Sequence, residues 1–282
     1  WHKVCFKISQ KRIMKKVILF ISLIIFVLNI HSQELKQLNN KAFKQGEKLT
    51  YVVYFDSFIT GKIFAAYATM MVSPNIEYIN NRPCYHAIIS GKTFKKWDWV
   101  IYVDDRFDTY IDTLSLVPWM FLRNAKEGKF RAEQQININQ SNNQAQFIDK
   151  IKNTNSVFKV DPYMQDMISA IYWGRNMDFS KMKPGNIFEV KYVFEDEIYK
   201  SRVAFGGKEK IKIDNGTFDC YYVMPEVQVG NVFKDPYAIK AYFTTDLNQI
   251  PIYVTCKIRL GNVRVELYEY ENLRNPLASK IE

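Results

Sequence analysis

Three aspartates are spaced four residues apart in one segment of the chain. Asp104, Asp108 and Asp112 would lie on one face of a β-strand, because alternate side chains of a strand point to the same side. Carboxylates in such a row could bind Ca²⁺ or act as an acid/base pair on a glycan. Arg106 and Tyr110 alternate with them, however, and the segment lacks the glycine and the ligand spacing of a calcium loop. This interleaving favours a solvated strand face that carries an Asp–Arg pair.

Cys84 and His86 form the second pair of residues that could do chemistry. They would share a strand face, where a thiol and an imidazole can act as nucleophile and base. A zinc site needs further ligands, so we expect a half-buried structural pair. The sequence also lacks the Gly-x-Ser-x-Gly, His-Glu-x-x-His and phosphate-loop motifs. It therefore predicts no catalytic residue, no metal and no cofactor, and a non-enzymatic protein is favoured.

Aromatic side chains are the remaining candidates for a binding site. Trp97 and Trp99 flank an aspartate, and Trp119 and Phe121 flank a methionine. Such rings could stack on sugars or grip a lipid, although packing in the core or at an interface is their commoner role. Together with Tyr172, which falls in a predicted helix, these four residues form the predicted ligand-binding set.

Residues 1–32 are predicted to be upstream sequence followed by a secretory signal peptide. Met14, the expected start, precedes two lysines, an apolar run from Val17 to Leu28 and the small residue Ser32. A short basic region, about a dozen apolar residues and a small residue are typical of a signal peptide. The run is shorter than the ~20 residues that a membrane span needs. We therefore expect cleavage and export, with no membrane span left in the mature chain.

The basic charge of the chain belongs largely to this segment. The 282 residues include 39 Lys+Arg against 29 Asp+Glu, which gives a net charge of +10. Residues 1–32 hold six of the basic residues and no acidic residue, so the remainder has a net charge of +4. A nucleic-acid partner is therefore not expected.

Three cysteines remain after the predicted cleavage: Cys84, Cys220 and Cys256. An odd number cannot form a complete set of disulfides within one chain. Each of the three lies in a strand-like run. Two alternatives stay open, namely three buried thiols or one Cys220–Cys256 bridge, which an oxidising compartment would allow.

Most of the mature chain, predicted as one domain over residues 33–282, has the pattern of an antiparallel sheet. Apolar and polar side chains alternate along 252–260 and again along 263–267, and Gly261-Asn262 between them is a hairpin signal. Asp214-Asn215-Gly216 marks another hairpin, and Glu127-Gly128 and Gly206-Gly207 are further predicted turns.

Two earlier predicted strands, 49–55 and 63–72, are apolar on both faces. Such strands are covered on both sides or line an enclosed cavity. The second strand contains Ala65, Ala66 and Ala68, and these small residues leave room for a helix or a ligand.

The clearest helix signal begins at Asp161-Pro162. An N-cap aspartate, a proline at the first helical position and apolar residues at helical spacing predict a helix over 162–175. It would join two β-rich halves, 44–155 and 185–271. The predicted fold is mainly β: a strongly curved antiparallel sheet, half-barrel or barrel-like, with one central helix.

Five segments in order resemble an uncharacterised family of exported bacterial proteins, the domain-of-unknown-function family 3108. They are 43–51, 103–112, 161–163 with 169–172 and Arg175, 216–220, and 245–251. The resemblance covers nearly all of 43–270. It implies an antiparallel envelope protein of Bacteroidota-like bacteria, located in the periplasm or outer envelope of a Gram-negative cell. It implies no activity, cofactor or catalytic residue.

The two-sided apolar strands, together with 9 Met and 20 Phe in the chain, favour a concave apolar surface. The leading hypothesis is a non-enzymatic exported protein that binds an apolar or lipid-like ligand or another envelope component. One alternative is a carboxylate-based enzyme that acts on an envelope glycan through the Asp104–Asp112 strand. The other is a scaffold that pairs a strand with a partner.

Overall fold

The structure, a computed structural model, describes residues 35–57, 61–97, 102–230, 232–259 and 261–282. The predicted signal peptide and Trp99 of the predicted ligand-binding set lie outside the described residues. Residues Lys36–Glu282 form one compact unit.

The strands of this unit belong to a single sheet. They are β1 (Lys48–Ser57), β2 (Gly61–Ile79), β3 (Arg82–Thr93), β4 (Asp104–Asp112), β5 (Pro118–Glu127), β6 (Phe130–Asn139), β7 (Gln144–Asp149), β8 (Thr154–Lys159), β9 (Gln165–Asp166), β10 (Ile187–Phe194), β11 (Glu197–Ile213), β12 (Gly216–Pro225), β13 (Ile239–Thr244), β14 (Pro251–Ile258) and β15 (Gly261–Glu271). The helical segments in the described part are α2 (Ser169–Gly174) and the short 3-10 turns η1 (Lys95–Trp97) and η2 (Phe179–Lys181).

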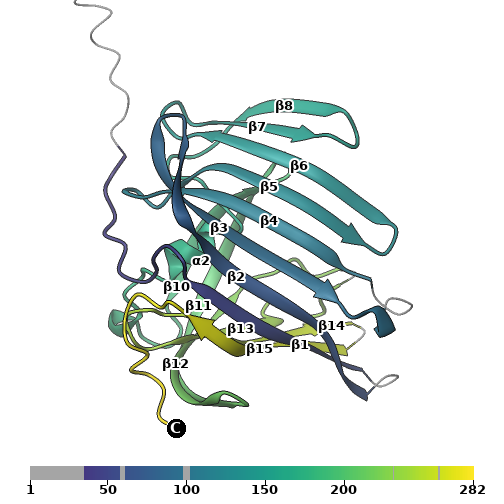
Figure 1. The fold of residues 1–282 in the computed structure, drawn as a ribbon, viewed down its shortest axis with the longest axis vertical. Helices are drawn as coiled ribbons and strands as arrows, with labels where there is room; N and C mark the ends of the chain where they lie inside the picture. Colours follow the sequence, from purple (N-terminus) through teal and green to yellow (C-terminus); the bar gives the residue numbers. More distant parts are fainter. Residues whose placement is uncertain (1–34, 58–60, 98–101, 231, 260) are drawn as a thin grey trace, which may run out of the picture. The chain divides into compact units, whose positions relative to one another are not determined.

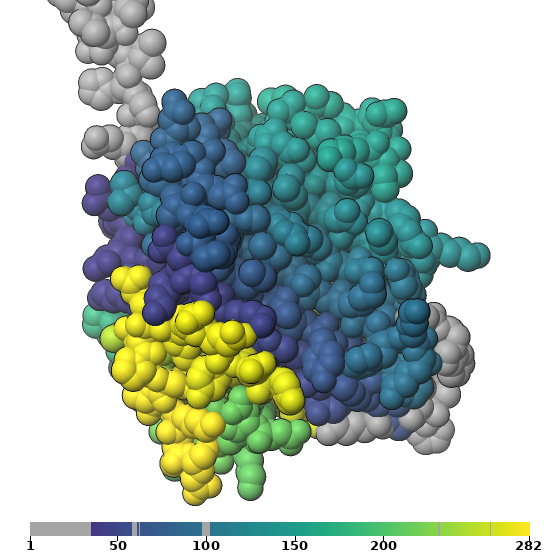
Figure 2. Space-filling model, in the orientation of Figure 1, coloured from purple at the N-terminus to yellow at the C-terminus, as the bar shows by residue number. Residues whose placement is uncertain are grey.

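Two meanders make up the sheet (Figure 1). Strands β1–β8 pair in sequence order, as do β10–β15, and the two runs meet where β1 pairs antiparallel with β15. Figure 2 shows the C-terminal segment, in yellow, lying against the purple N-terminal segment. The short β9 pairs in parallel with β10, and the other strand pairs are antiparallel. The edges β8 and β9 do not pair with each other in the described part, so the sheet is not closed. The predicted fold class is thus confirmed as mainly antiparallel β with one short helix.

Both predicted hairpins are present, but Gly261 and Asn262, the predicted turn residues of the second, are the first residues of β15 and the turn lies before them. Ile213 pairs with Gly216 across the turn that joins β11 to β12. Ile258 pairs with Gly261 at the β14–β15 turn. The predicted Glu127-Gly128 turn joins β5 to β6, and Gly128 has the positive φ of 53° that glycine adopts readily.

The predicted turn at Gly206-Gly207 is wrong. Both glycines lie inside β11, where a bulge shifts the register between Phe205 and Gly207. Gly206 packs against the ring of Tyr222 so closely that an added Cβ would lie 1.8 Å from a ring carbon. Glycines inside a strand mark a bulge or a close approach as readily as paired glycines mark a turn.

The helix is shorter than predicted: α2 spans Ser169–Gly174, not residues 162–175. Tyr163 has a φ of +59°, a left-handed conformation that interrupts any helix starting at Pro162. Asp161, the predicted N-cap, forms an ion pair with Lys191 at 2.7 Å instead.

A later aspartate holds the start of the helix. Oδ1 of Asp166 accepts hydrogen bonds from the backbone N–H groups of Ile168 (2.7 Å) and Ser169 (2.8 Å). Its other carboxylate oxygen accepts a hydrogen bond from the hydroxyl of Thr109 on β4. Asp166 therefore satisfies backbone donors at the helix start, as an N-cap residue does, and also links β9 to the first meander. Burial raises its pKa to about 6, although the hydrogen bonds from Thr109, Ser169 and Ile168 act in the opposite direction.

The main hydrophobic core draws on both meanders and on α2. Alternate residues of each strand point into it, as the period of a strand requires. Its fully buried large side chains include Phe43, Leu49, Ile111, Phe121, Ile136, Ile138, Met164, Tyr172, Phe218 and Ile250. A smaller cluster around Phe179 packs against β11 and β12.

A buried ion pair lies beside this core. Arg175, directly after α2, donates two hydrogen bonds to the carboxylate of Glu47, at 2.6 and 2.9 Å, and both side chains are almost fully buried. The guanidinium also donates to the backbone carbonyls of Ala42 and Asn248. Burial alone would lower the pKa of Arg175, yet Glu47 raises it overall. The pair therefore ties the end of the helix to the N-terminal segment and to the β13–β14 turn.

Removing one member of this pair should destabilise the protein strongly. Glu47→Gln leaves a buried guanidinium without its counter-ion, and we expect a loss of about 3–5 kcal/mol in the free energy of unfolding. Glu271→Gln is the matched control, because Glu271 forms an exposed pair with Lys48 and such pairs contribute at most about 1 kcal/mol. Urea denaturation at pH 7 measures both. Equal losses in the two variants would contradict the structural role of the buried pair.

Asp166 predicts a pH dependence of stability. Its folded pKa of about 6 lies above the unfolded value of 3.8, so protonation favours the folded state. This difference in pKa stabilises the folded state by roughly 2–3 kcal/mol below about pH 4. The stabilisation is lost as the pH rises through 6. Asp166→Asn keeps an acceptor for the two backbone N–H groups but does not ionise. The variant should therefore gain stability relative to the wild type between pH 4.5 and 7.5 in urea denaturation, whereas a constant difference would rule out this titration.

Candidate functional site

An apolar cavity of about 540 Å³ lies between the two meanders and α2. Its lining comes from β1–β3, from β10–β15 and from the helix. It is the candidate functional site because concave, largely apolar pockets of roughly 300–1,000 Å³ are typical of small-molecule sites.

One cross-strand row forms part of the wall. Val223 pairs with Ala241, Ala241 with Val254, and Val254 with Val265, across β12, β13, β14 and β15. Directly paired residues of neighbouring strands point to the same face, and all four of these line the cavity. The alternation that predicted a half-buried sheet therefore places a continuous apolar row on the cavity side.

A second wall is formed by β10. Phe188, Val190 and Tyr192 alternate along this strand and line the cavity, whereas Glu189 and Lys191 lie between them. Lys191 and Glu189 are partly exposed and lie 3.7 Å apart.

The helix forms a third side through Met167, Ala170, Ile171, Trp173 and Gly174. Two of these residues are small. Ala68 of β2 lines the cavity as well, as the small residues of the 63–72 segment suggested. Small side chains on both the strand and the helix leave space that Leu or Phe would fill.

The cavity has few polar groups. Among the described residues that line it, Glu226 is the only acidic or basic residue, and its carboxylate lies 4.0 Å from Arg202. The hydroxyl of Tyr51 donates to the carbonyl of Pro251 at 2.8 Å, and burial raises its pKa. Ser201 donates to the backbone carbonyl of Glu226. The lining residues described thus include no cation that could bind an anionic group.

The predicted ligand-binding residues do not come together in this cavity. The indole of Trp97 donates to the carbonyl of Phe64 at 2.7 Å, in a partly buried position. Phe121 and Tyr172 are buried in the main core. Trp119 is buried and borders a separate, polar groove. Trp99 lies outside the described residues.

The sequence suggested that the aspartates of β4 lie on a solvated face. In the structure, Asp108 and Asp112 are buried. Asp112 is fully buried and accepts hydrogen bonds from Arg82 at 2.7 Å and from the indole of Trp119 at 3.1 Å, besides two backbone N–H groups. Burial raises the pKa of Asp112, but these donors outweigh it and the pKa is lowered overall. Asp104 is the more exposed member and forms an ion pair with Lys92.

Asp108 contacts Arg106 and His86, and His86 in turn lies beside Glu77. Asp108 accepts two hydrogen bonds from Arg106 and lies 2.7 Å from Nε2 of His86, whose Nδ1 lies 3.3 Å from Glu77. His86 stacks on Tyr110 with ring centroids 4.5 Å apart. Burial opposes ionisation of Asp108, yet His86 and Arg106 lower its pKa to about 2. The predicted Asp–Arg pair is therefore present, with Asp108 buried beside a histidine and Arg106 exposed.

The cysteines do not form a bridge. Cys84, Cys220 and Cys256 are free; the first two are buried and Cys256 is partly buried. The thiol of Cys84 donates to the carbonyl of Arg82, and burial raises its pKa to about 12, so it is not a thiolate nucleophile.

Two further properties concern the described residues alone. They contain no group of three or more His, Cys, Asp or Glu side chains placed to hold a metal ion. None of their helices has the length and hydropathy needed to cross a membrane.

Sequence reasoning missed most of the cavity residues, although a signal for some was present. The alternation Phe188-Glu189-Val190-Lys191-Tyr192 has the period of a strand with one apolar face. The row across β12–β15 depends on the register of four strands, which no single segment encodes.

The two ends of the acidic strand should differ in their contribution to stability. Asp112→Ala leaves Arg82, Trp119 and two backbone N–H groups without their acceptor, and we expect a loss of about 2–4 kcal/mol. Asp104→Ala removes only a partly exposed pair with Lys92 and should change stability by about 0.5 kcal/mol or less. Urea denaturation at pH 7 compares them. A loss of less than about 1 kcal/mol for Asp112→Ala would mean that its carboxylate is solvated.

Comparison with known proteins supports the fold. A β-barrel-like protein of the domain of unknown function DUF1849 from Brucella abortus has a TM-score of 0.53 and 10% identity, covering 82% of this chain and 98% of that chain. A Bacteroides fragilis protein with a YmcC-like fold has a TM-score of 0.32 at 10% identity, with the same coverage of 82% and 98%. A search of curated proteins finds no match.

The family comparison is more direct. The family described as "Protein of unknown function (DUF3108)" matches residues 50–268, which is more than half of the chain. This range contains β2–β14 and α2 whole, and all but the ends of β1 and β15. The chain therefore belongs to the DUF3108 family.

Proposed function

We propose that the protein is an exported, non-enzymatic envelope protein that holds an apolar, lipid-like molecule in the cavity between the two meanders. The observation that carries this proposal is the lining, in which aliphatic and aromatic side chains from three sides surround about 540 Å³. Burial of apolar surface provides roughly 25 cal/mol per Å², so an acyl chain or a similar group would gain from entering. The described lining has no cation, so the buried part of the ligand is uncharged.

The proposed sheet is a strongly curved half-barrel around α2. Side-chain contacts between the meanders support this geometry. Arg123 of β5 forms an ion pair with Glu195 of the β10–β11 turn at 3.0 Å, and Thr109 of β4 donates to Asp166 of β9. The likeness to a β-barrel-like protein at a TM-score of 0.53 is consistent with it.

The proposed location is the periplasm or outer envelope of a Gram-negative bacterium. The support is the signal-peptide pattern of residues 1–32, which ends before the compact unit begins at Lys36. A partner for the loaded protein would be another envelope component.

The enzymatic alternative is less well supported. A glycosidase needs one carboxyl group with a raised pKa as the general acid. The pKa values of Asp104, Asp108 and Asp112 are all lowered. Burial raises the pKa of Asp105, but by the alternation of the strand Asp105 lies on the opposite face from these three carboxylates. The scaffold alternative has one favourable observation, because β8 is a sheet edge whose Val157 is largely exposed.

The cavity can be tested with an apolar fluorescent dye and with mass spectrometry. Wild-type protein from its native host should release a lipid on solvent extraction, and the delipidated protein should bind N-phenyl-1-naphthylamine. Ala241→Phe places a ring inside the cavity wall and should weaken dye binding at least tenfold.

Ala278→Phe is the matched control, because Ala278 is exposed and is not part of the lining. It should bind the dye like the wild type, and thermal denaturation checks that both variants are folded. A wild-type protein that carries no lipid and binds no dye would refute the proposal.

A further inference from the structure

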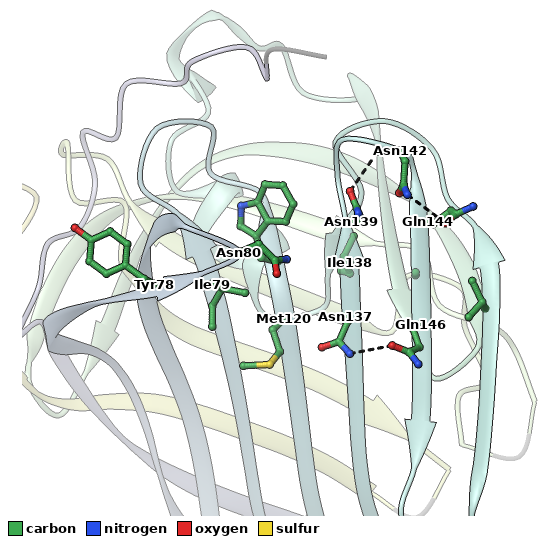
Figure 3. Close-up of a pocket in the computed structure, with 13 residues that line it drawn as sticks. Tyr78, Ile79, Asn80, Met120, Asn137, Ile138, Asn139, Asn142, Gln144 and Gln146 are labelled. Atoms are coloured by element: carbon green, nitrogen blue, oxygen red, sulfur yellow. Dashed lines mark hydrogen bonds between the residues drawn. The ribbon is translucent and has the colours of Figure 1, made fainter. Parts of the chain in front are cut away.

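A second pocket of the described structure is a polar groove of about 680 Å³ (Figure 3). It runs along β5–β8 and is bordered by the end of β2 and the β2–β3 turn. One directly paired row crosses it: Met120 with Asn137, Asn137 with Gln146, and Gln146 with Val157. Their sequence neighbours Ile138 and Ala145 are buried in the main core. The groove and the apolar cavity share no lining residue, so they are separate sites.

Side-chain amides dominate the chemistry of this groove. Its lining includes Asn80, Asn137, Asn139, Asn142, Gln144 and Gln146, and the described lining residues include no Lys, Arg, Asp or Glu. A phosphate, a carboxylate or a nucleic acid would find no cation here, and a metal ion would find no carboxylate. The groove thus favours an uncharged ligand.

The amides are partly ordered by one another. Nδ2 of Asn137 donates to Oε1 of Gln146 at 3.3 Å, and Nε2 of Gln146 donates to Asn155 at 3.1 Å. Figure 3 shows the first of these contacts and a similar one between Asn142 and Gln144. Each amide has two N–H donors and an oxygen with two lone pairs. Asn137, Gln144 and Gln146 therefore keep donor and acceptor positions that a ligand can use. The oxygen of Asn139 instead accepts from the backbone N–H groups of Ser141 and Asn142.

An exposed aromatic ring accompanies the amides. Tyr78, at the end of β2, borders the groove and has 71% of its surface exposed. In Figure 3, Asn80 and Met120 lie between Tyr78 and the side chains of Asn137 and Gln146, and the hydroxyl of Tyr78 points away from them. An exposed ring offers a flat apolar face with a polar tip.

We infer that this groove binds a neutral saccharide chain. A sugar presents hydroxyl groups that both donate and accept, which matches primary amides, and it presents C–H faces that pack on an aromatic ring. A groove open at the surface accepts a chain of sugar units. An apolar lipid would leave the amides of the groove without partners, at a cost for each polar group that it desolvates.

The test is a binding screen of the full mature protein on an array of neutral and acidic oligosaccharides. At least one neutral oligosaccharide should bind in preference to the acidic ones, and titration calorimetry should give its Kd. In ¹⁵N NMR spectra, the side-chain NH₂ signals of Asn137, Gln144 and Gln146 should shift on binding. Tyr78→Ala and Gln146→Ala should each weaken binding at least tenfold.

Tyr268→Ala is the matched control, because Tyr268 is a comparably exposed tyrosine, at 58%, on β15 and outside the groove. It should bind like the wild type, and so should Ala241→Phe, which changes only the apolar cavity. The inference is overturned if no neutral glycan binds, if only acidic glycans bind, or if binding survives both Tyr78→Ala and Gln146→Ala. Persistent binding in both variants would place the glycan site on another surface.

Discussion

The structure depends on one buried ion pair. Glu47 and Arg175 are held out of water, so each charge would cost several kcal/mol if the other were missing. Their geometry reduces that cost because the guanidinium contacts both carboxylate oxygens and two backbone carbonyls. Gln249 adds hydrogen bonds to the carbonyls of Arg175 and Met177. Three segments that are distant in the sequence must therefore arrive together: the entry to β1, the end of α2 and the β13–β14 turn. The helix that forms one side of the apolar cavity is fixed in place by this junction, so the volume of the cavity depends on a polar contact outside it.

The same junction explains which residues the family resemblance rests on. Three of the five matching segments, 43–51, 169–175 and 245–251, meet at Glu47, Arg175 and Asn248. A fourth contains Asp112, whose carboxylate fixes the loop after β4. Each of these residues therefore has a structural role. The resemblance could therefore predict the fold without predicting an activity, because these contacts build the scaffold. The same segments also contribute Tyr51, Ala170, Ile171 and Pro251 to the cavity lining.

Local patterns predicted local structure well. The hairpin at 214–216 follows from turn residues between alternating strands and is present. The β14–β15 hairpin is also present, but its turn precedes the predicted residues 261–262, which belong to β15. The start of α2 was not predictable in this way, because Tyr163 adopts a left-handed conformation and Asp166, not Asp161, binds the first backbone N–H groups. The burial of Asp112 was also missed, since it follows from Arg82, 30 residues away, and from Trp119 folding back onto the strand. The cavity wall and the amide groove each depend on cross-strand register. Register is a property of several strands together, and the alternation within one strand does not define it.

The pairing of β1 with β15 has a consequence for how the chain reaches this structure. Lys48 and Glu271 are neighbours across that pair although 223 residues separate them. Contacts between such distant residues require a large loop to close first, and folding slows as they become more numerous. Each meander can form hairpin by hairpin as the chain is synthesised, but the β1–β15 pair that joins the two meanders needs β15. Until that strand is available, β1 has a free edge, and a cavity lined by both meanders has only part of its wall. The two meanders can therefore join into one sheet only after the C-terminal residues have been synthesised.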